Sequence, residues 1–453
     1  MRRKAIALIP LLATAMGLPL VAGCGGEANA GDGTVTVTVG YQSKTINTVT
    51  AGTLLRSLGS FEKELAALGA RDGIRYKVKW QDYATGAPIT AQMTAGKIDI
   101  GSMGDFPLLI NAARGTQLRR PTRLVSVTGY NLRGGLNTIV TEPGSTLTSL
   151  ADLRGKKVST SIGSAADGTL VRALQREGID SEKDIHKLNQ QPAVGASALQ
   201  SGSVDALSQF VAWPGQLAFQ HKATALYDGA ALNLPTFHGV TAREDFAKKR
   251  PAVLKAFLRA QITATGYLHE HPVQAAEKVA SATGLPAEAV YLYNGANGIA
   301  SFDPTLKPRL VSALKKDVSI LKAEKLVGDV DVDGFVDDRY VKAAYGAGYA
   351  KQLAVTAPAP RSEVWLKGAD RTRAFTSPAR ALHYAAGQGG RVRAVYVPDA
   401  TTGTLWYADH AVWVRDGAGL KPFVTAATAR AYVTAHPGAR QISYATARAK
   451  ATS

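Results

Sequence analysis

Cysteine is almost absent from this chain of 453 residues, in which Cys24 is the only one. An intrachain disulfide, a cysteine-based metal cluster and an internal thiol pair are therefore excluded. Long basic runs are also lacking, because no stretch of Lys and Arg exceeds three residues and no module of interleaved arginines and aromatics occurs. The net charge is +18 and the pI is near 9.8. Without such a module, this charge favours a surface that faces acidic polymers, and we expect no nucleic-acid partner.

No apolar run is long enough for a comfortable membrane span. Residues 5–21 are apolar but interrupted by Pro and Gly, and they follow the basic segment Met1–Lys4, as in a signal peptide. The run ends Leu-Val-Ala-Gly-Cys at Cys24, which resembles a bacterial lipobox. We predict a lipoprotein signal peptide over 1–24, a lipid anchor at Cys24, a flexible tether over 25–33 and an extracytoplasmic location at the cell membrane. Plain secretion and a single-span anchor are the alternatives.

What the chain does contain is a regular alternation of strand and helix patterns. Residues 34–39 alternate strictly and are β-branched, which predicts a strand, and 76–80 form a second one. Helices are predicted over 53–68 and 87–95. This order predicts an α/β fold with a parallel sheet and helical crossovers. The length allows two or three compact units.

The stretch from Thr94 to Ala113 joins a predicted strand to a predicted helix. The pattern indicates a strand over 98–101, a tight turn over 102–105, and a helix that opens at Phe106-Pro107 with Asp105 as its N-cap. Such a helix start presents unpaired N–H groups and the positive end of the helix dipole, which suit an anion or a carbonyl group. An ordinary strand-to-helix turn is the alternative.

A similar arrangement recurs in the second half of the chain. A strand is predicted to end at Ser161-Ile162-Gly163-Ser164-Ala165, directly before a helix over 169–177. Residues 198–206 also repeat the pattern of 95–100, with a helix end, a Gly and then a Val-Asp or Ile-Asp pair. Two Ser/Gly turns, one in each half, indicate two lobes of similar build that supply the two walls of a cleft.

Several of these segments resemble one protein family. The run AGKIDIGSMGDFP at 95–107 resembles the "aGkiDfg.tGdaP" signature of substrate-binding proteins of nitrate, sulfonate and taurine ABC importers. The run DLRGKKV at 152–158 and the helical segment 243–283 resemble further parts of the same family. The resemblance covers about residues 34–350. It implies a type II periplasmic-binding-protein fold in which two lobes, joined by two crossovers, close by hinge bending. Lobe 1 would comprise about 34–130 and 236–350, and lobe 2 about 131–235.

The resemblance also implies a function. The chain would be a monomeric solute-binding lipoprotein that passes a small anionic or zwitterionic solute, of the aliphatic sulfonate, taurine or nitrate class, to an ABC permease and its ATPase. It would have no enzymatic activity, cofactor or metal. The expected ligand contacts are Gln42, Ser43, Gly104, Asp105, Phe106, Ser161, Ser164, Ala165 and Trp213. The family usually places an Asp between this Trp and the next Pro, whereas Trp213 is followed directly by Pro214. We expect the lone His238 to be structural.

The segment after residue 350 lies outside this resemblance. A Pro/Ala-rich linker over 351–360 marks a boundary, and residues 361–453 predict a small α+β domain of two ββαβ units, about 364–397 and 411–444. The duplication resembles the copper-chaperone lipoproteins of nitrous-oxide reductase maturation. The tail contains no Met or Cys, so soft-metal ligands are lacking, although His383, His410 and His436 remain. It carries 13 basic and 5 acidic residues.

Two other classes of function stay open at this point. One is a pyrimidine-binding or synthase-like protein of the thiamine pathway on the same fold, but such synthases carry a Cys-rich motif and this chain has no second Cys. The other is a lipoprotein whose tail domain delivers a metal ion, although the tail has no thiol or thioether ligands.

Overall fold

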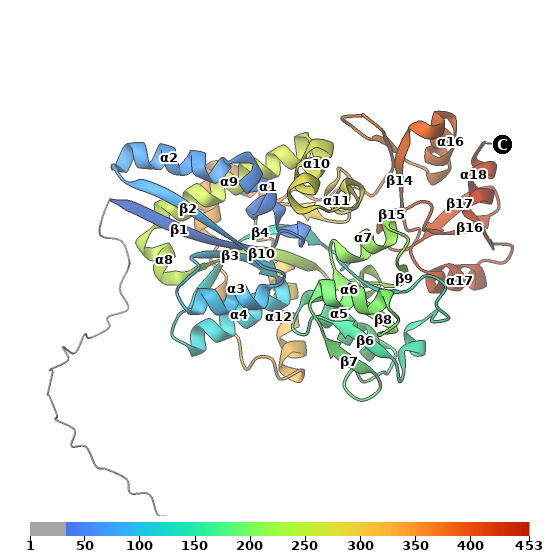
Figure 1. Cartoon of the computed structure of the whole chain (residues 1–453), viewed down its shortest axis with the longest axis horizontal. Helices are drawn as coiled ribbons and strands as arrows, with labels where there is room; N and C mark the ends of the chain where they lie inside the picture. Colours follow the sequence, from blue (N-terminus) through green and yellow to red (C-terminus); the bar gives the residue numbers. More distant parts are fainter. Residues whose placement is uncertain (1–32, 358, 453) are drawn as a thin grey trace, which may run out of the picture.

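The structure is a computed structural model that describes residues 33–357 and 359–452. The predicted signal peptide, Cys24 and the tether up to residue 32 lie outside the described residues. Two α/β lobes lie side by side, and a smaller domain packs against the end of the molecule opposite to the start of the first strand (Figure 1). Within the described ranges, no helix combines the length and apolar character that crossing a membrane requires.

Lobe 1 is built on a mixed sheet of six strands in the order β11-β4-β10-β3-β1-β2. Its strands are β1 (Thr34–Tyr41), β2 (Arg75–Asp82), β3 (Ile100–Gly104), β4 (Thr122–Asn131), β10 (Thr236–Arg243) and β11 (Ser301–Phe302). β1 pairs in parallel with β2 and β3, whereas β10 is antiparallel to both β3 and β4. The chain therefore leaves lobe 1 after β4 and returns to it in β10.

Helices cover both faces of this sheet. They are η1 (Ile46–Ala51), α1 (Thr53–Leu58), α2 (Ser60–Asp72), α3 (Gly86–Thr94), α4 (Asp105–Gln117), α8 (Glu244–Lys249), α9 (Pro251–Glu270), α10 (Pro272–Thr283), α11 (Ala287–Asn294), α12 (Pro308–Ala323), α13 (Val332–Phe335), α14 (Arg339–Tyr345), η4 (Gly346–Gly348) and α15 (Tyr349–Leu353). The core between them is one apolar cluster that includes Phe61, Phe257 and Leu108, each fully buried.

Lobe 2 repeats this plan on a smaller scale. Its sheet has the order β7-β6-β8-β5-β9, with β6 parallel to β7 and β8, and β5 antiparallel to β8 and β9. The elements are β5 (Asn137–Thr141), η2 (Leu150–Leu153), β6 (Lys157–Thr160), α5 (Ala165–Arg176), β7 (His186–Asn189), α6 (Pro192–Gln200), β8 (Ala206–Phe210), α7 (Trp213–Phe219), β9 (Thr224–Asp228) and η3 (Gly229–Leu232). In both lobes, three parallel strands are followed by one antiparallel strand, so the predicted α/β architecture of two similar lobes is confirmed.

Several predicted element boundaries are wrong. The helix expected over 53–68 is broken at Gly59, whose left-handed φ of 62° separates α1 from α2. The tight turn expected over 102–105 does not exist, because β3 runs on to Gly104 and α4 begins at once. The second lobe's helix starts at Ala165, four residues earlier than expected, with Ser164 as its N-cap.

The tail forms two small antiparallel sheets, β13-β12-β14-β15 and β17-β16-β18. The elements are β12 (Ser362–Leu366), β13 (Arg373–Phe375), α16 (Pro378–Gln388), η5 (Gly389–Arg391), β14 (Val392–Pro398), β15 (Leu405–Tyr407), β16 (Val412–Asp416), β17 (Gly419–Phe423), α17 (Ala426–Ala435), β18 (Arg440–Ile442) and α18 (Tyr444–Thr452). Each unit places its first strand between its second and its last. The strand β15 and the helix α18, which packs on α16, are additions that the sequence patterns did not indicate.

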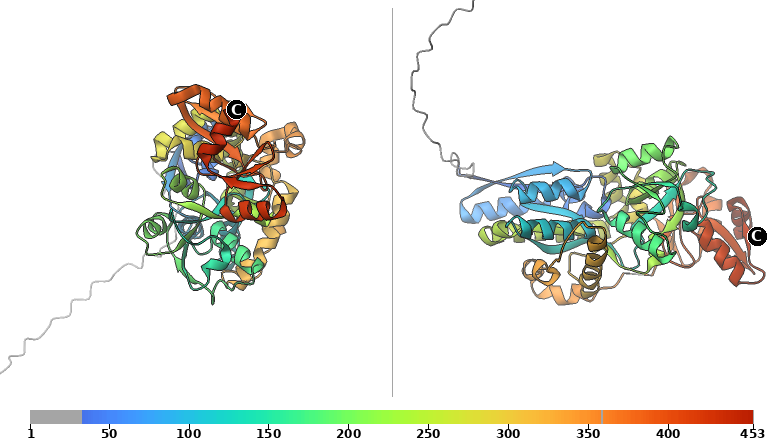
Figure 2. Two further views of the ribbon diagram at one scale, coloured as in Figure 1. Left: turned by 90° about the vertical axis from the view of Figure 1, so that its right-hand side faces the viewer. Right: turned by 90° about the horizontal axis from the view of Figure 1, so that it is seen from below.

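This tail domain is packed against both lobes. On the lobe 1 side, Arg393 forms ion pairs with Glu277 and Glu288, and its guanidinium lies 3.9 Å from the centre of the Trp365 ring. On the lobe 2 side, the Tyr407 hydroxyl donates to the carbonyl of Gly215 at 3.1 Å. The two views in Figure 2 show the tail lying over this end of the molecule.

One apolar cluster continues through all three parts. Trp365, Tyr396 and Tyr407 of the tail pack with Tyr291 of α11 and with Ala218 of α7. A second polar contact is buried as well, since the Thr402 hydroxyl donates to the Asp228 carboxylate of lobe 2 at 2.7 Å. The tail is therefore joined to both lobes by buried side chains.

We predict that tail and lobes unfold together. Replacing Arg393 by Met removes two partly buried ion pairs and the stacking on Trp365, and should lower the free energy of unfolding by about 1–2 kcal/mol. Arg391→Met is the matched control, because Arg391 is exposed and bonds only Gln388 by its side chain. Urea unfolding followed by tryptophan fluorescence measures both. A wild-type protein that loses the tail in a separate, earlier transition would contradict this prediction.

Candidate functional site

A cavity of about 130 Å³ lies where strand ends of both lobes meet. In sheets of this kind, ligands bind beyond the carboxyl ends of the parallel strands. Its walls come from lobe 1 beyond β1 and β3 and from lobe 2 beyond β6 and β8. The lining residues are Gln42, Thr85, Gly86, Ala87, Gly104, Pro107, Ser161, Ile162, Gly163, Ser164, Ala165, Asn189, Gln191, Phe210 and His238.

The first residues of three helices border this cavity. Gly86 opens α3, Gly104 is the N-cap of α4, and Ser164 is the N-cap of α5 with Ala165 as the first helical residue. A helix start carries N–H groups without intrahelical partners and about half a positive charge from the aligned peptide dipoles. Helices of both lobes therefore turn their positive ends toward the same small space.

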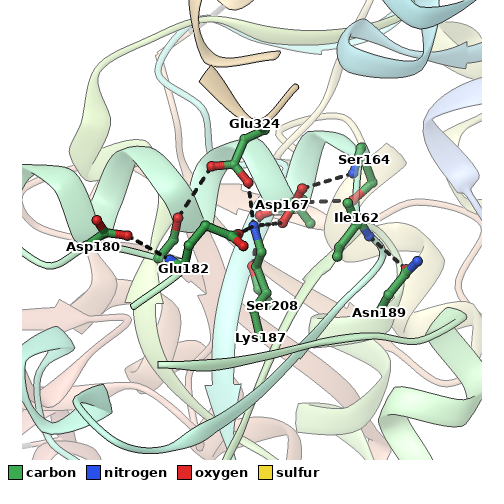
Figure 3. A network of polar contacts seen from close by, with 12 residues as sticks. Ile162, Ser164, Asp167, Asp180, Glu182, Lys187, Asn189, Ser208 and Glu324 are labelled. Atoms are coloured by element: carbon green, nitrogen blue, oxygen red, sulfur yellow. Dashed lines mark hydrogen bonds and ion pairs between the residues drawn. The ribbon is translucent and has the colours of Figure 1, made fainter. Parts of the chain in front are cut away.

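Side chains of lobe 2 hold the turn at 161–164 in place (Figure 3). The Asp167 carboxylate accepts the N–H of Gly163 at 2.9 Å, and the Asn189 side chain accepts the N–H of Ile162 at 3.1 Å. The Ser164 hydroxyl accepts the N–H of Asp167, which closes the first turn of α5. Burial raises the pKa of Asp167 to about 6, although the nearby Lys187 opposes the shift.

Lys187 connects this turn to the other lobe. Its ammonium lies 3.9 Å from Asp167, and it also pairs with Glu182 of lobe 2 and with Glu324, which follows α12 of lobe 1 (Figure 3). The ammonium is almost fully buried, with 5% of the side chain exposed. The ion pairs therefore fix the cavity wall of lobe 2 and hold it against lobe 1.

A second interlobe contact surrounds Arg172 of α5. Its guanidinium donates to the Asp317 carboxylate of α12 at 2.6 Å and lies 5.6 Å from the centre of the Phe106 ring of α4. Burial raises the pKa of Asp317 well above its usual range, an effect that the Asp105 charge adds to and Arg172 opposes. The Arg172 guanidinium thus stabilises the charged forms of two buried carboxyl groups of lobe 1, those of Asp317 and Asp105.

Gly168 allows α5 to approach the Phe106 ring of α4 closely. A Cβ on Gly168 would lie 2.1 Å from Cζ of Phe106, so the ring rests directly on the backbone of α5. The structure therefore shows the lobes in contact through α4, α5 and α12.

Five of the nine predicted ligand contacts line the cavity. They are Gln42, Gly104, Ser161, Ser164 and Ala165. The other four, Ser43, Asp105, Phe106 and Trp213, are not among the lining residues, and their role as ligand contacts stays a prediction.

In the structure, each of these four side chains has other partners. Ser43 donates its N–H and hydroxyl to Asp82. Asp105 is not the N-cap of α4 but its first residue, and its buried carboxylate accepts the N–H groups of Phe106 and Phe237. Trp213 packs into an apolar cluster of lobe 2. Phe106, in turn, contacts α5, as described above.

Sequence reasoning missed several residues of the cavity wall. His238, which we expected to be structural, lies on β10 opposite Gly104 and lines the cavity. Thr85, Asn189, Gln191 and Phe210 also line it. Their positions are the available signal, because Asn189 and Phe210 end β7 and β8, Thr85 and Gln191 follow β2 and β7, and residues at the carboxyl ends of strands are candidates for ligand contact. Over the described ranges, no three His, Cys, Asp or Glu side chains converge in a way that would hold a metal ion.

Two α/β lobes that are joined by two crossovers and enclose a cavity at their strand ends define the type II periplasmic-binding-protein fold. Residues 73–275 match the family model described as NMT1/THI5 like. A solved structure of the alkanesulfonate-binding protein SsuA from Xanthomonas axonopodis pv. citri bound to MOPS aligns with a TM-score of 0.56 at 24% identity, over 67% of this chain and 98% of that protein. The predicted fold class is thereby confirmed.

Sequence relatives carry related names. An aliphatic sulfonates-binding protein of Bacillus subtilis (strain 168) is 25% identical over 328 residues, which is 72% of this chain and 93% of the relative. Another from Escherichia coli (strain K12) is 28% identical over 217 residues, which is 48% of this chain and 66% of that relative. The resemblance to substrate-binding proteins that the motifs indicated is confirmed. The resemblance of the tail to copper chaperones stays a prediction.

We predict that filling the space at Gly168 separates the lobes. Gly168→Ala places a methyl group against the Phe106 ring and should cost about 1–3 kcal/mol in the closed form, with a larger radius of gyration in solution scattering. Adding Phe106→Leu should restore part of the loss. Gly266→Ala in α9 is the control, since nothing lies within 4 Å of its added Cβ, and it should stabilise the helix by up to about 1 kcal/mol. An unchanged radius and stability in Gly168→Ala would show that the lobes do not rest on each other here.

We predict a specific pH dependence for Asp105. Burial raises its pKa from 3.8 to about 6, so the folded protein binds this proton more readily than the unfolded chain. Stability that depends on Asp105 should therefore rise as the pH falls from 7 to 5, by about 1 kcal/mol. The difference in free energy of unfolding between wild type and Asp105→Asn, measured at both pH values, isolates this contribution from those of other carboxyl groups. A difference that stays constant or reverses would contradict the raised pKa.

Proposed function

We propose that this protein is a solute-binding component of an ABC importer that takes up a small anionic or zwitterionic solute of the aliphatic sulfonate, taurine or nitrate class. The observation that carries the proposal is the cavity between the lobes, with helix starts from both sides directed at it. Helix starts bind anionic head groups through N–H groups and dipoles. The names of the relatives agree with this chemistry.

The size of the cavity fits a small solute. A volume of about 130 Å³ is several times the space that a single water molecule needs. Serine and amide side chains line much of the wall, among them Gln42, Ser161 and Gln191. Such a wall holds and orients a solute, and we assign no chemical step to the chain. Delivery to a permease and its ATPase follows from this role.

The location belongs to the same proposal. A signal peptide over 1–24 and a lipid on Cys24 would place the protein outside the cytoplasmic membrane, held by the tether up to residue 33. We expect the protein to act as a monomer. A membrane-fractionation experiment with Cys24→Ala, which should release the protein from the membrane, tests the anchor separately from solute binding.

Ser164 provides a test of the cavity. Asp caps a helix as well as Ser does, so Ser164→Asp keeps the N-cap of α5 while it places a negative charge at the cavity wall. We predict that Ser164→Asp retains a free energy of unfolding within about 1 kcal/mol of wild type. Its affinity for propane-1-sulfonate, measured by titration calorimetry, should fall by at least about tenfold because of charge repulsion.

Ser164→Ala is the matched uncharged variant. It loses the cap, should lose about 1 kcal/mol of stability, and should bind more tightly than Ser164→Asp. Equal affinity in all three proteins would place solute binding outside this cavity. A wild-type protein that binds no sulfonate and no nitrate would refute the proposed solute class.

A further inference from the structure

The side chain of His238 is almost fully buried, yet the residue lines the cavity. The residue is 3% exposed. Its Nδ1 lies 3.3 Å from Nδ2 of Asn47, which follows β1 in η1. Its Nε2 lies next to Gly104, since a Cβ built on Gly104 would be 3.2 Å from this nitrogen. The same Cβ would be 3.7 Å from the Cβ of Ala165 in the other lobe. Among the described residues, none forms a hydrogen bond with Nε2.

The protonation state of this ring follows from its surroundings. Burial lowers the pKa of His238 to about 3, so the imidazole is neutral at pH 7 and carries one proton. Because the Asn47 amide donates to Nδ1, this nitrogen acts as the acceptor and the proton is on Nε2. The Nε2–H is therefore a donor that lies beside Gly104 and Ala165, two residues of the cavity wall.

The positive potential at the cavity is not balanced by an acidic side chain among the described lining residues. The helix starts of α3, α4 and α5 supply positive potential. None of the described residues that line the cavity is Asp, Glu, Lys or Arg. The nearest buried carboxylates are engaged elsewhere, since Asp105 accepts backbone N–H groups and Asp167 holds Gly163 beside Lys187.

An ammonium group would thus enter this cavity without a counter-charge. Removing a cation from water without a partner is costly, whereas an anionic head finds donors on both walls.

We propose that the cavity selects an anion whose remainder is uncharged, and that His238 is a specificity-determining residue that donates its Nε2–H to the anionic head. This inference rests on the proposed function and narrows its solute class to simple alkanesulfonates and related small anions, against zwitterions such as taurine.

Two isosteric probes test the selection. Propane-1-sulfonate and taurine differ by a methyl group in place of an ammonium group, and calorimetry on the full-length protein should show at least about tenfold tighter binding of propane-1-sulfonate. Equal affinity, or a preference for taurine, would overturn the selection while leaving the solute-binding role intact. If neither sulfonate binds, the narrowing to alkanesulfonates is overturned, whether or not nitrate binds.

His238 variants test the donor. His238→Leu removes it and should weaken binding of propane-1-sulfonate at least about tenfold, as expected for a hydrogen bond to a charged group. His238→Gln, whose amide can still donate, should retain part of the affinity. His186→Gln is the control, because His186 is exposed on β7, away from the cavity lining. Wild-type affinity in His238→Leu would overturn the assignment.

A final measurement does not depend on any ligand. Nitrogen-15 NMR of the histidine rings in the full-length protein, with His238 identified by comparison with His238→Gln, reports the tautomer directly. The inference requires a neutral ring with the proton on Nε2 at pH 7. A proton on Nδ1, or an imidazolium, would refute it even if no tested anion binds.

Discussion

The contact between Arg172 and Asp317 is the constraint on which the arrangement of the lobes depends. It joins α5 of lobe 2 to α12 of lobe 1 with both side chains nearly buried. Such a pair is costly to break, because the Arg172 guanidinium alone would be left charged in a buried position. With α5 held in this way, Gly168 meets Phe106, and the starts of α4 and α5 come together. The cavity exists because these two helix starts are adjacent, and the buried pair keeps them so.

Charged side chains in this protein hold the lobes together, while the backbone and neutral side chains face the solute space. Arg172, Lys187, Asp317 and Glu324 all lie in interlobe contacts, and none of them lines the cavity. This separation has a physical advantage, since helix starts and amide groups stabilise an anion without requiring a buried counter-ion that would be unpaired in the empty protein.

Much of the fold followed from sequence patterns, but the details of the site did not. The alternating residues 34–39 and the repeat of 95–100 at 198–206 indicated two similar lobes, because strand periodicity is a local property. The Ser and Gly turns at 104 and 161–165 also indicated the cavity. Asp105 and Phe106 belong to the same segment, yet they face Phe237 and α5. Which way a side chain points at a helix start depends on partners more than 60 residues away, and His238 was undervalued for the same reason.

The tail adds a property that two lobes alone would not have. In a simple two-lobed protein, swinging one lobe away from the other exposes mainly the polar walls of the cleft. Here Tyr407 touches lobe 2 and Tyr396 touches lobe 1 within one continuous apolar cluster. A wide swing must therefore either carry the tail along with one lobe or expose aromatic rings to water, which is unfavourable. The tail thus limits how far the two lobes can separate. A small separation of the two cavity walls is then the route by which a solute enters and leaves.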